Sequence, residues 1–220
     1  MSLIRIIHIS LPLLASVAGL YAYKTLDKSL KLILLYSVIG FCTEFMLWIA
    51  VKSGVRNTMP PLHFYVMVEF LIWGTFYMNL LKNYLKRKYL LILIIVFEIF
   101  CVINMIFIQK LTEYAHTRSV ENLIILLLAV IFYAKVMTEQ QIEKLVISPF
   151  IWVNTVVLIY FAGNFFYNIV FIPLLKNDVQ FLKTISLYIF ATLNTLFYIG
   201  ICVAFLLQRH NLKEKTDNNF

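Results

Sequence analysis

Residues 150–172, FIWVNTVVLIYFAGNFFYNIVFI, form an uncharged run of 23 residues between Pro149 and Pro173. At ~1.5 Å per residue, a helix of this length extends ~35 Å and can cross the ~30 Å hydrocarbon core of a bilayer. The whole chain has the same character: 62% of its residues are hydrophobic, 14% are charged, and its mean hydropathy is +0.86. This composition excludes a soluble globular domain.

The same run carries a polar stripe. Tyr160, Asn164, Tyr167 and Asn168 stand at i, i+4, i+7 and i+8, so they share one helix face, with Gly163 beside them. Amide side chains are costly against lipid. We therefore expect this face to contact other helices or a wet cavity.

Six further apolar segments are long enough to span a membrane, at residues 4–23, 30–51, 62–81, 89–108, 119–136 and 184–207. The sequence therefore predicts an all-α, polytopic membrane protein with seven transmembrane helices. We expect one domain over residues 1–207 and a short polar cytoplasmic tail over 208–220, which we expect to be disordered.

The basic residues predict an orientation. If all seven segments span, seven of the 19 lysines and arginines lie on one side and twelve on the other. The richer side is expected to face the cytoplasm, which puts the N-terminus outside and the C-terminus inside the cytoplasmic (inner) membrane of a bacterium. Ser16-Val17-Ala18 resembles a signal-peptidase site, but cleavage there would reverse this charge bias, so we expect the first segment to be a helix.

Polar residues inside the segments gather toward the predicted outer side. Glu44, Glu69 and Asn164 are expected at a similar depth, ~10 Å below the outer surface, with Glu98 and Asn194 nearer the midplane. A charge at mid-membrane costs ~2.5–3.5 kcal/mol on insertion scales. Because no lysine or arginine is expected at that depth, salt bridges cannot neutralise the glutamates. We expect their carboxyl groups to be protonated, hydrogen-bonded or wetted.

These observations predict a polar pocket open to the outside. Its candidate ligand-binding residues are Glu44, Glu69, Glu98, Tyr160, Asn164, Tyr167, Asn168 and Asn194. The competing interpretation is that such residues are interhelical hydrogen-bond contacts worth ~1 kcal/mol each, and for Asn194 this interpretation is favoured. Glu121 and Asn122 stand at a predicted helix start, where capping is the favoured role. We predict no catalytic, cofactor-binding or metal-binding residue.

Several functional classes are weakened by the residues present. A retinal Schiff base needs a lysine deep in the last segment, which has only Lys183 at its edge. There is no HExxH, GxSxG, Walker or dinucleotide-binding pattern. A zinc site formed by His8, His63 and Glu69 remains geometrically conceivable.

The segments NLIILLLAVIFYAKVM (122–137) and PFIWVNTVVLIYFAGNFFYNI (149–169) resemble those of small uncharacterised bacterial membrane proteins with about seven helices. The layout is also similar to the seven-helix input domains of bacterial sensor proteins, although no kinase or other output domain is recognised in this sequence. The resemblance implies neither an activity nor a site residue.

We therefore expect a ligand-binding or sensing module that acts with a separate cytoplasmic or membrane protein partner. The alternatives are a small proton- or cation-coupled transporter or channel and, less favoured, a lipid-modifying intramembrane enzyme. A closed inner half would favour sensing, and a continuous polar path past Asn79 and Asn154 would favour transport. The expected surroundings are the lipid bilayer and the expected ligand is a small molecule. We expect no nucleic acid partner and no cofactor.

Overall fold

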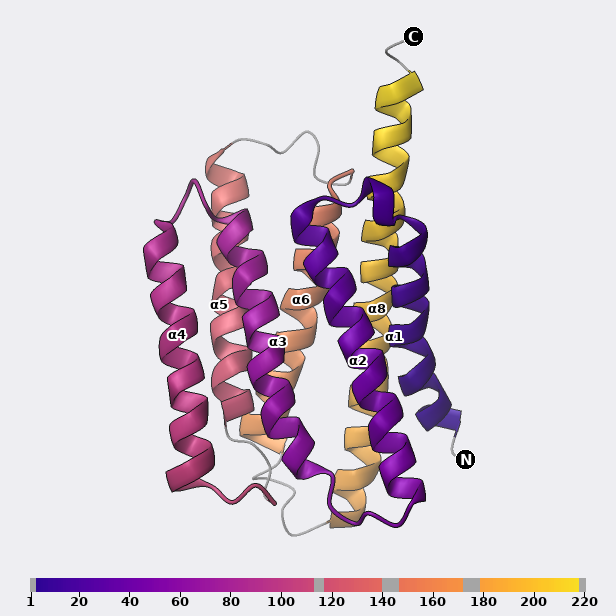
Figure 1. The fold of residues 1–220 in the computed structure, drawn as a ribbon, viewed down its shortest axis with the longest axis vertical. Helices are drawn as coiled ribbons and strands as arrows, with labels where there is room; N and C mark the ends of the chain where they lie inside the picture. Colours follow the sequence, from indigo (N-terminus) through magenta and orange to yellow (C-terminus); the bar gives the residue numbers. More distant parts are fainter. Residues whose placement is uncertain (1–2, 113–116, 140–146, 172–178, 218–220) are drawn as a thin grey trace.

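The computed structural model describes residues 3–112, 117–139, 147–171 and 179–217, and within these ranges the chain forms seven α-helices (Figure 1). The helices are α1 (Leu3–Tyr21), α2 (Lys28–Lys52), α3 (Met59–Leu80), α4 (Arg87–Ile103), α5 (Thr117–Thr138), α6 (Pro149–Phe166) and α8 (Val179–Asp217). Short π-helical turns, η2 (Asn104–Ile108) and η4 (Tyr167–Phe171), continue α4 and α6. A 3-10 turn, η1 (Tyr23–Thr25), follows α1. The all-α prediction is confirmed.

Local sequence explains where several helices begin. The Asp27 side chain caps α2 by accepting a hydrogen bond of 2.8 Å from the Leu30 backbone N–H. Pro149 stands at the first position of α6, where a backbone N–H has no acceptor within the helix, so a proline there costs no hydrogen bond. Prolines in the first turn of α3 act in the same way.

Helix α8 continues beyond the predicted end of the last span. Residues 208–217 are helical, so the expected disorder is wrong for this part of the tail. The guanidinium of Arg209 lies 3.5 Å from the ring centroid of Tyr21, and the Asn211 side-chain amide donates a hydrogen bond of 2.8 Å to the Ile147 carbonyl. These contacts hold the extension of α8 against two other parts of the chain.

Five helices are long and apolar enough to cross a membrane: α2, α4 with η2, α5, α6 with the start of η4, and the Leu187–Glu214 part of α8. Helix α1 adds a shorter apolar stretch, Ile9–Tyr21. Helix α3 is not among the five, because polar residues such as His63, Glu69 and Asn79 lower its hydropathy. The chain is therefore a multi-pass membrane protein with five long apolar helices and one shorter one.

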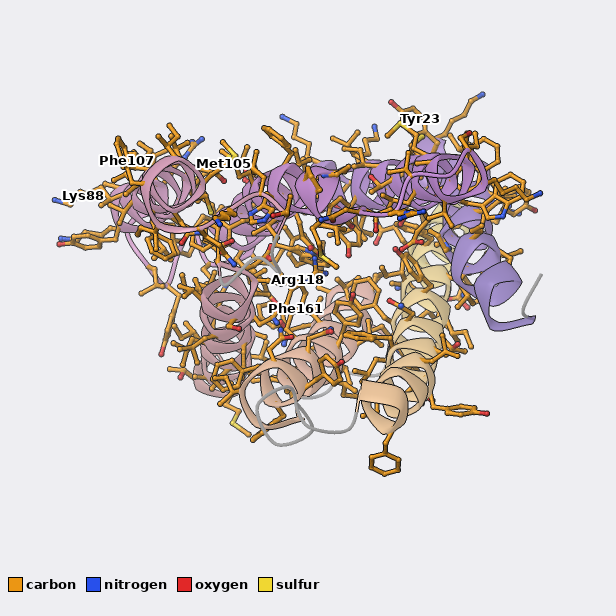
Figure 2. The ribbon with its side chains drawn as sticks, turned by 90° about the horizontal axis from the view of Figure 1, so that it is seen from below. Tyr23, Lys88, Met105, Phe107, Arg118 and Phe161 are labelled. Carbon is orange, nitrogen blue, oxygen red and sulfur yellow. The ribbon has the colours of Figure 1, made fainter. Side chains whose placement is uncertain are left out.

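The helices pack as a closed ring with one helix outside it. Around the ring the order is α1, α2, α3, α5, α6 and α8, and α8 packs against α1 to close it. Helix α4 packs on the outside of this ring, against α3. Seen end-on, α2, α3 and α4 form one layer and α5, α6 and α8 the other (Figure 2).

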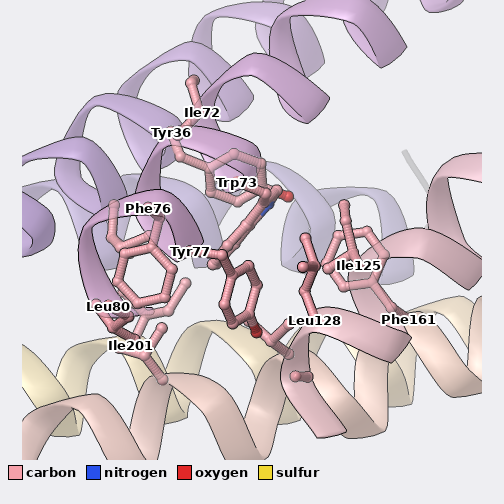
Figure 3. Packing of buried hydrophobic residues seen from close by; sticks show 14 of the residues in the cluster. Tyr36, Ile72, Trp73, Phe76, Tyr77, Leu80, Ile125, Leu128, Phe161 and Ile201 are labelled. Carbon is pink, nitrogen blue, oxygen red and sulfur yellow. The ribbon is translucent and has the colours of Figure 1, made fainter. Parts of the chain in front are cut away.

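Aromatic side chains fill much of the ring's interior. Trp73 of α3 is fully buried and makes edge-on contacts, with 5.2 to 6.0 Å between ring centroids, to Tyr36, Phe76, Phe161 and Phe197. Figure 3 shows Trp73 among Tyr36, Phe76 and Phe161. Such edge-to-face pairs contribute ~0.5–1.5 kcal/mol each beyond their burial. Inside a membrane, where lipid is as apolar as the core, this packing is a main source of helix association.

Glycines allow α6 and α8 to approach closely. A Cβ at Gly200 of α8 would overlap the side chain of Val156 on α6. A Cβ at Gly163 of α6 would lie 2.7 Å from the side chain of Leu193 on α8. Each helix thus accommodates an aliphatic side chain of the other at a glycine, which is the small-residue packing typical of membrane helices.

Candidate functional site

The carboxylate of Glu69 is the centre of a buried polar network. Its side chain is 0% exposed, on α3. Tyr36 of α2 donates a hydrogen bond of 2.8 Å from its hydroxyl to Glu69 Oε1, and Arg118 Nη2 of α5 lies 3.5 Å from Glu69 Oε2. The two carboxylate oxygens are therefore contacted from two different helices, and three helices meet at this one group.

Further tyrosines surround this network. The hydroxyls of Tyr65 on α3 and Tyr198 on α8 interact with that of Tyr36. Both hydroxyls also approach Gly40 of α2, where an added Cβ would lie 2.9 Å from Tyr198 Oη and 3.7 Å from Tyr65 Oη. The glycine leaves room for the hydroxyls, and helix α8 is thereby connected to the polar network.

The buried face of helix α5 is polar near the start of the helix. Arg118, Glu121, Asn122 and Ile125 stand at i, i+3, i+4 and i+7, and the stripe continues into the buried apolar residues of the same helix. The Arg118 side chain is 17% exposed and lies between the two helix layers (Figure 2). Its guanidinium also lies 6.0 Å from the centroid of the Tyr65 ring. Arg118 thus points into the bundle rather than out to solvent.

Glu121 is the least satisfied polar group of this region. It is 0% exposed, and within the described residues both of its carboxylate oxygens lack a hydrogen-bond partner. It interacts electrostatically with Glu69, Arg118 and Glu98. The adjacent Asn122 is 1% exposed, and its side-chain nitrogen likewise has no hydrogen-bond partner in the described part of the chain.

Two predictions about charge are wrong here. The prediction that no basic residue reaches the depth of the glutamates fails for Glu69. Helix α5 begins at Thr117, so Arg118 lies in its first turn, and a long arginine side chain can reach a partner deeper in the bundle. The capping role for Glu121 and Asn122 also fails, because the helix starts before them and both side chains are buried.

The polar stripe of α6 faces the protein, as its spacing predicts. Tyr160, Asn164, Tyr167 and Asn168 are all buried. Tyr160 packs on Phe197 with 4.5 Å between ring centroids, and Tyr167 packs on Phe190 at 4.6 Å. The Asn164 side-chain amide donates a hydrogen bond of 2.8 Å to the Tyr160 carbonyl of its own helix. The stripe thus lines the interface with α8.

The remaining candidate residues are distributed around the bundle. Glu44 is half-buried on α2, two helical turns from Tyr36, and interacts electrostatically with Tyr160 and Tyr198. Glu98 is half-buried on α4, outside the ring, and one of its oxygens is buried without a hydrogen-bond partner among the described residues. Asn194 is half-buried on α8. Glu69 is the candidate glutamate whose hydrogen bond to Tyr36 and ion pair with Arg118 are seen in the described residues.

A second polar cluster lies toward the opposite end of the bundle. Asn154 of α6 is 0% exposed. Its side-chain oxygen accepts a hydrogen bond of 2.8 Å from the Tyr77 hydroxyl, and its nitrogen donates one of 3.1 Å to the Ala129 carbonyl. Asn154 therefore links α3, α5 and α6 with both of its polar atoms satisfied, as expected for an interhelical hydrogen-bond contact.

The positions of the possible metal-ligating side chains bear on the zinc hypothesis. Across residues 3–112, 117–139, 147–171 and 179–217, no group of three or more His, Cys, Asp or Glu side chains is placed to hold a metal ion. The side chain of His8 lies outside the described side chains, so the conceivable zinc site with His63 and Glu69 stays a hypothesis.

No family model, curated protein or solved structure matches this chain in comparisons with known proteins. The resemblance to seven-helix bacterial membrane proteins therefore remains one of layout.

Proposed function

We propose that the chain is a sensing module of the cytoplasmic membrane, in which a small molecule binds at the polar network around Glu69 and a separate protein partner receives the signal. The observation that carries this proposal is that Glu69 joins three helices through a buried hydrogen bond and a buried ion pair. A ligand that competes for the Glu69 carboxylate or the Arg118 guanidinium would alter the contacts of α2, α3 and α5 together. We include the α6 stripe and Glu44, Glu98 and Asn194 in the surroundings of the proposed site.

Helix α8 offers a route from the site to a partner. Tyr198 interacts with the network, and the same uninterrupted helix continues to Asp217. Its C-terminal turns project beyond the other helices at the end that carries the α1–α2 and α3–α4 connections (Figure 1). A shift of α8 at Tyr198 would therefore move a segment that projects beyond the other helices.

A layer of aromatic residues favours sensing over transport. Glu69, Trp73 and Tyr77 stand at i, i+4 and i+8 of α3, so the fully buried Trp73 lies between the Glu69 network and the Tyr77–Asn154 pair. Phe161 and Phe197 pack against the same indole ring. This packing supports a site that is closed toward the second polar cluster.

The alternative is a small proton- or cation-coupled transporter or channel that uses Glu44, Glu69 and Glu98. The specific observation in its favour is that Glu121 is a second fully buried carboxyl group beside Glu69, in addition to the half-buried Glu44 and Glu98. Its weakness is that Glu98 lies on α4, outside the helix ring, while Asn154 is fully hydrogen-bonded.

Native mass spectrometry of gently extracted protein tests the proposal. We expect the wild type to retain a non-lipid small molecule that Glu69→Gln loses. Glu139→Gln, which removes a partly exposed carboxylate just after the end of α5, should retain it and so serves as the matched control. Retention of the same molecule by all three proteins, or of bulk lipid alone, would contradict the proposal.

A further inference from the structure

Among the described residues, the buried charges near Arg118 do not balance. Glu69 and Glu121 are both fully buried, and each interacts electrostatically with the single guanidinium of Arg118. Glu69 has Arg118 at 3.5 Å and the Tyr36 hydroxyl at 2.8 Å. Glu121 has no comparable contact, since both of its oxygens lack a hydrogen-bond partner among the described residues. In the part of the chain that the structure describes, one carboxylate is thus in excess when both are ionised.

Such a group is costly unless something compensates for it. An ionised carboxylate removed from water loses several kcal/mol of solvation, as an order of magnitude, unless it takes up a proton, a positive partner or several hydrogen bonds. Glu98, the other acidic neighbour of Glu121 besides Glu69, would add to the excess when ionised. The site is therefore complementary to a proton or to another cation.

The surrounding atoms indicate which kind of cation. Divalent metal ions require several oxygen ligands at short distance, and the described residues provide no group of three or more acidic, histidine or cysteine side chains placed to hold a metal. A primary ammonium needs fewer acceptors than such a metal ion, because it has only three N–H groups to donate. The unsatisfied atoms nearby include the Glu121 oxygens and also the Asn122 side-chain nitrogen, which is a donor. A ligand that carries both an ammonium group and a hydroxyl would satisfy both residues.

We propose that Glu121 binds the ammonium group of a small primary amine, with Asn122 donating a hydrogen bond to a hydroxyl or carbonyl oxygen of the same molecule. This inference rests on the proposed function and names the class of ligand at that site. It assigns the recognition of the ammonium group to Glu121 and leaves Glu69 as the group that joins the helices.

The test is the thermal unfolding of the detergent-solubilised protein with ethanolamine hydrochloride as the probe. Sodium chloride at equal ionic strength and uncharged ethylene glycol are the reference additives. We expect ethanolamine to raise the Tm of the wild type and of Glu139→Gln by several degrees in a saturable manner, and to leave the Tm of Glu121→Gln unchanged. Mixed micelles that contain phosphatidylethanolamine form a second arm, which shows whether the ammonium group belongs to a free amine or to a lipid headgroup.

Equal Tm shifts in all three proteins, or a wild-type shift no larger than that with sodium chloride in both arms, would overturn the inference. Should Glu121→Gln fail to fold, Glu121→Asp keeps the charge on a shorter side chain and should need at least a several-fold higher ethanolamine concentration; an unchanged concentration dependence would contradict the proposal. If Glu69→Gln still loses a small molecule other than an amine in native mass spectrometry, this inference fails while the proposed function stands.

Discussion

Arg118 of α5 and Glu69 of α3 form a buried ion pair, with 3.5 Å between Nη2 and Oε2, although the two residues stand 49 positions apart in the sequence. The Tyr36 hydroxyl completes the environment of the carboxylate from α2. A pair of this kind is expensive to break from one side, because the remaining charge stays buried without its partner. It fixes three helices relative to one another and marks the region where a ligand could act on all of them.

The hydrogen bond from Tyr36 to Glu69 should contribute measurably to stability. Tyr36→Phe keeps the aromatic packing on Trp73 and removes only the hydroxyl, so we expect a loss of ~1.5–3 kcal/mol, as is typical of a hydrogen bond to a charged group. Thermal or denaturant unfolding in micelles measures this difference. Tyr188→Phe, at a tyrosine that is 62% exposed, should change stability by no more than ~0.5 kcal/mol.

Gly200 should not tolerate a side chain. Gly200→Ala would place a methyl group against Val156 of α6, and such overpacking costs ~1–3 kcal/mol. The free energy of unfolding should fall accordingly, and the second change Val156→Ala should recover part of the loss because it removes the contacting atoms. A Gly200→Ala variant with wild-type stability would contradict the close α6–α8 contact.

The two polar clusters should respond differently to substitution. Asn154→Ala leaves the buried Tyr77 hydroxyl without its acceptor, and we expect a loss of ~1–3 kcal/mol in stability. It should not change which small molecule the protein retains, because Asn154 is an interhelical contact on the far side of Trp73. Native mass spectrometry of Asn154→Ala beside Glu69→Gln makes this comparison, and loss of the ligand in Asn154→Ala would favour the transport alternative.

The expected membrane orientation can be tested with single cysteines. In a background in which Cys42, Cys101 and Cys202 are replaced by alanine, Ser53→Cys should react with a membrane-impermeant maleimide added to intact cells. Asn83→Cys, on the connection at the opposite end of the bundle, should react only after the membrane is opened. The reverse labelling pattern would contradict the orientation predicted from the distribution of lysine and arginine.

Much of the fold could be predicted from the sequence. Continuous apolar segments identify helices directly, because a membrane allows few other structures. The spacing of Tyr160, Asn164, Tyr167 and Asn168 correctly predicted a buried face, because polar side chains on one face of a membrane helix avoid lipid. One exception was the α8 extension, where the contact between Arg209 and Tyr21 stabilises polar residues that had no helical signal of their own.

The site was predicted less completely because it depends on which helices become neighbours. Depth along a helix suggested Glu69, but it could not show that Tyr36 and Arg118 converge on that carboxylate from two other helices. One signal was present in the sequence. Arg118, Glu121 and Asn122 extend the buried stripe of α5 at helical spacing, which favours an inward-facing position over a cap. Extending this stripe back to the first turn of the helix would have identified Arg118 as an inward-facing cation.

The central claim is that Glu69 and Arg118 form one buried network, and a double-mutant cycle tests it most directly. The unfolding free energies of the wild type, Glu69→Gln, Arg118→Gln and the double variant give the coupling between the two side chains. We predict that each single change is strongly destabilising, by as much as ~3–5 kcal/mol, and that the double variant loses less than their sum by at least ~1 kcal/mol. Effects that add to within ~0.5 kcal/mol would show that the two residues act independently and would contradict the account.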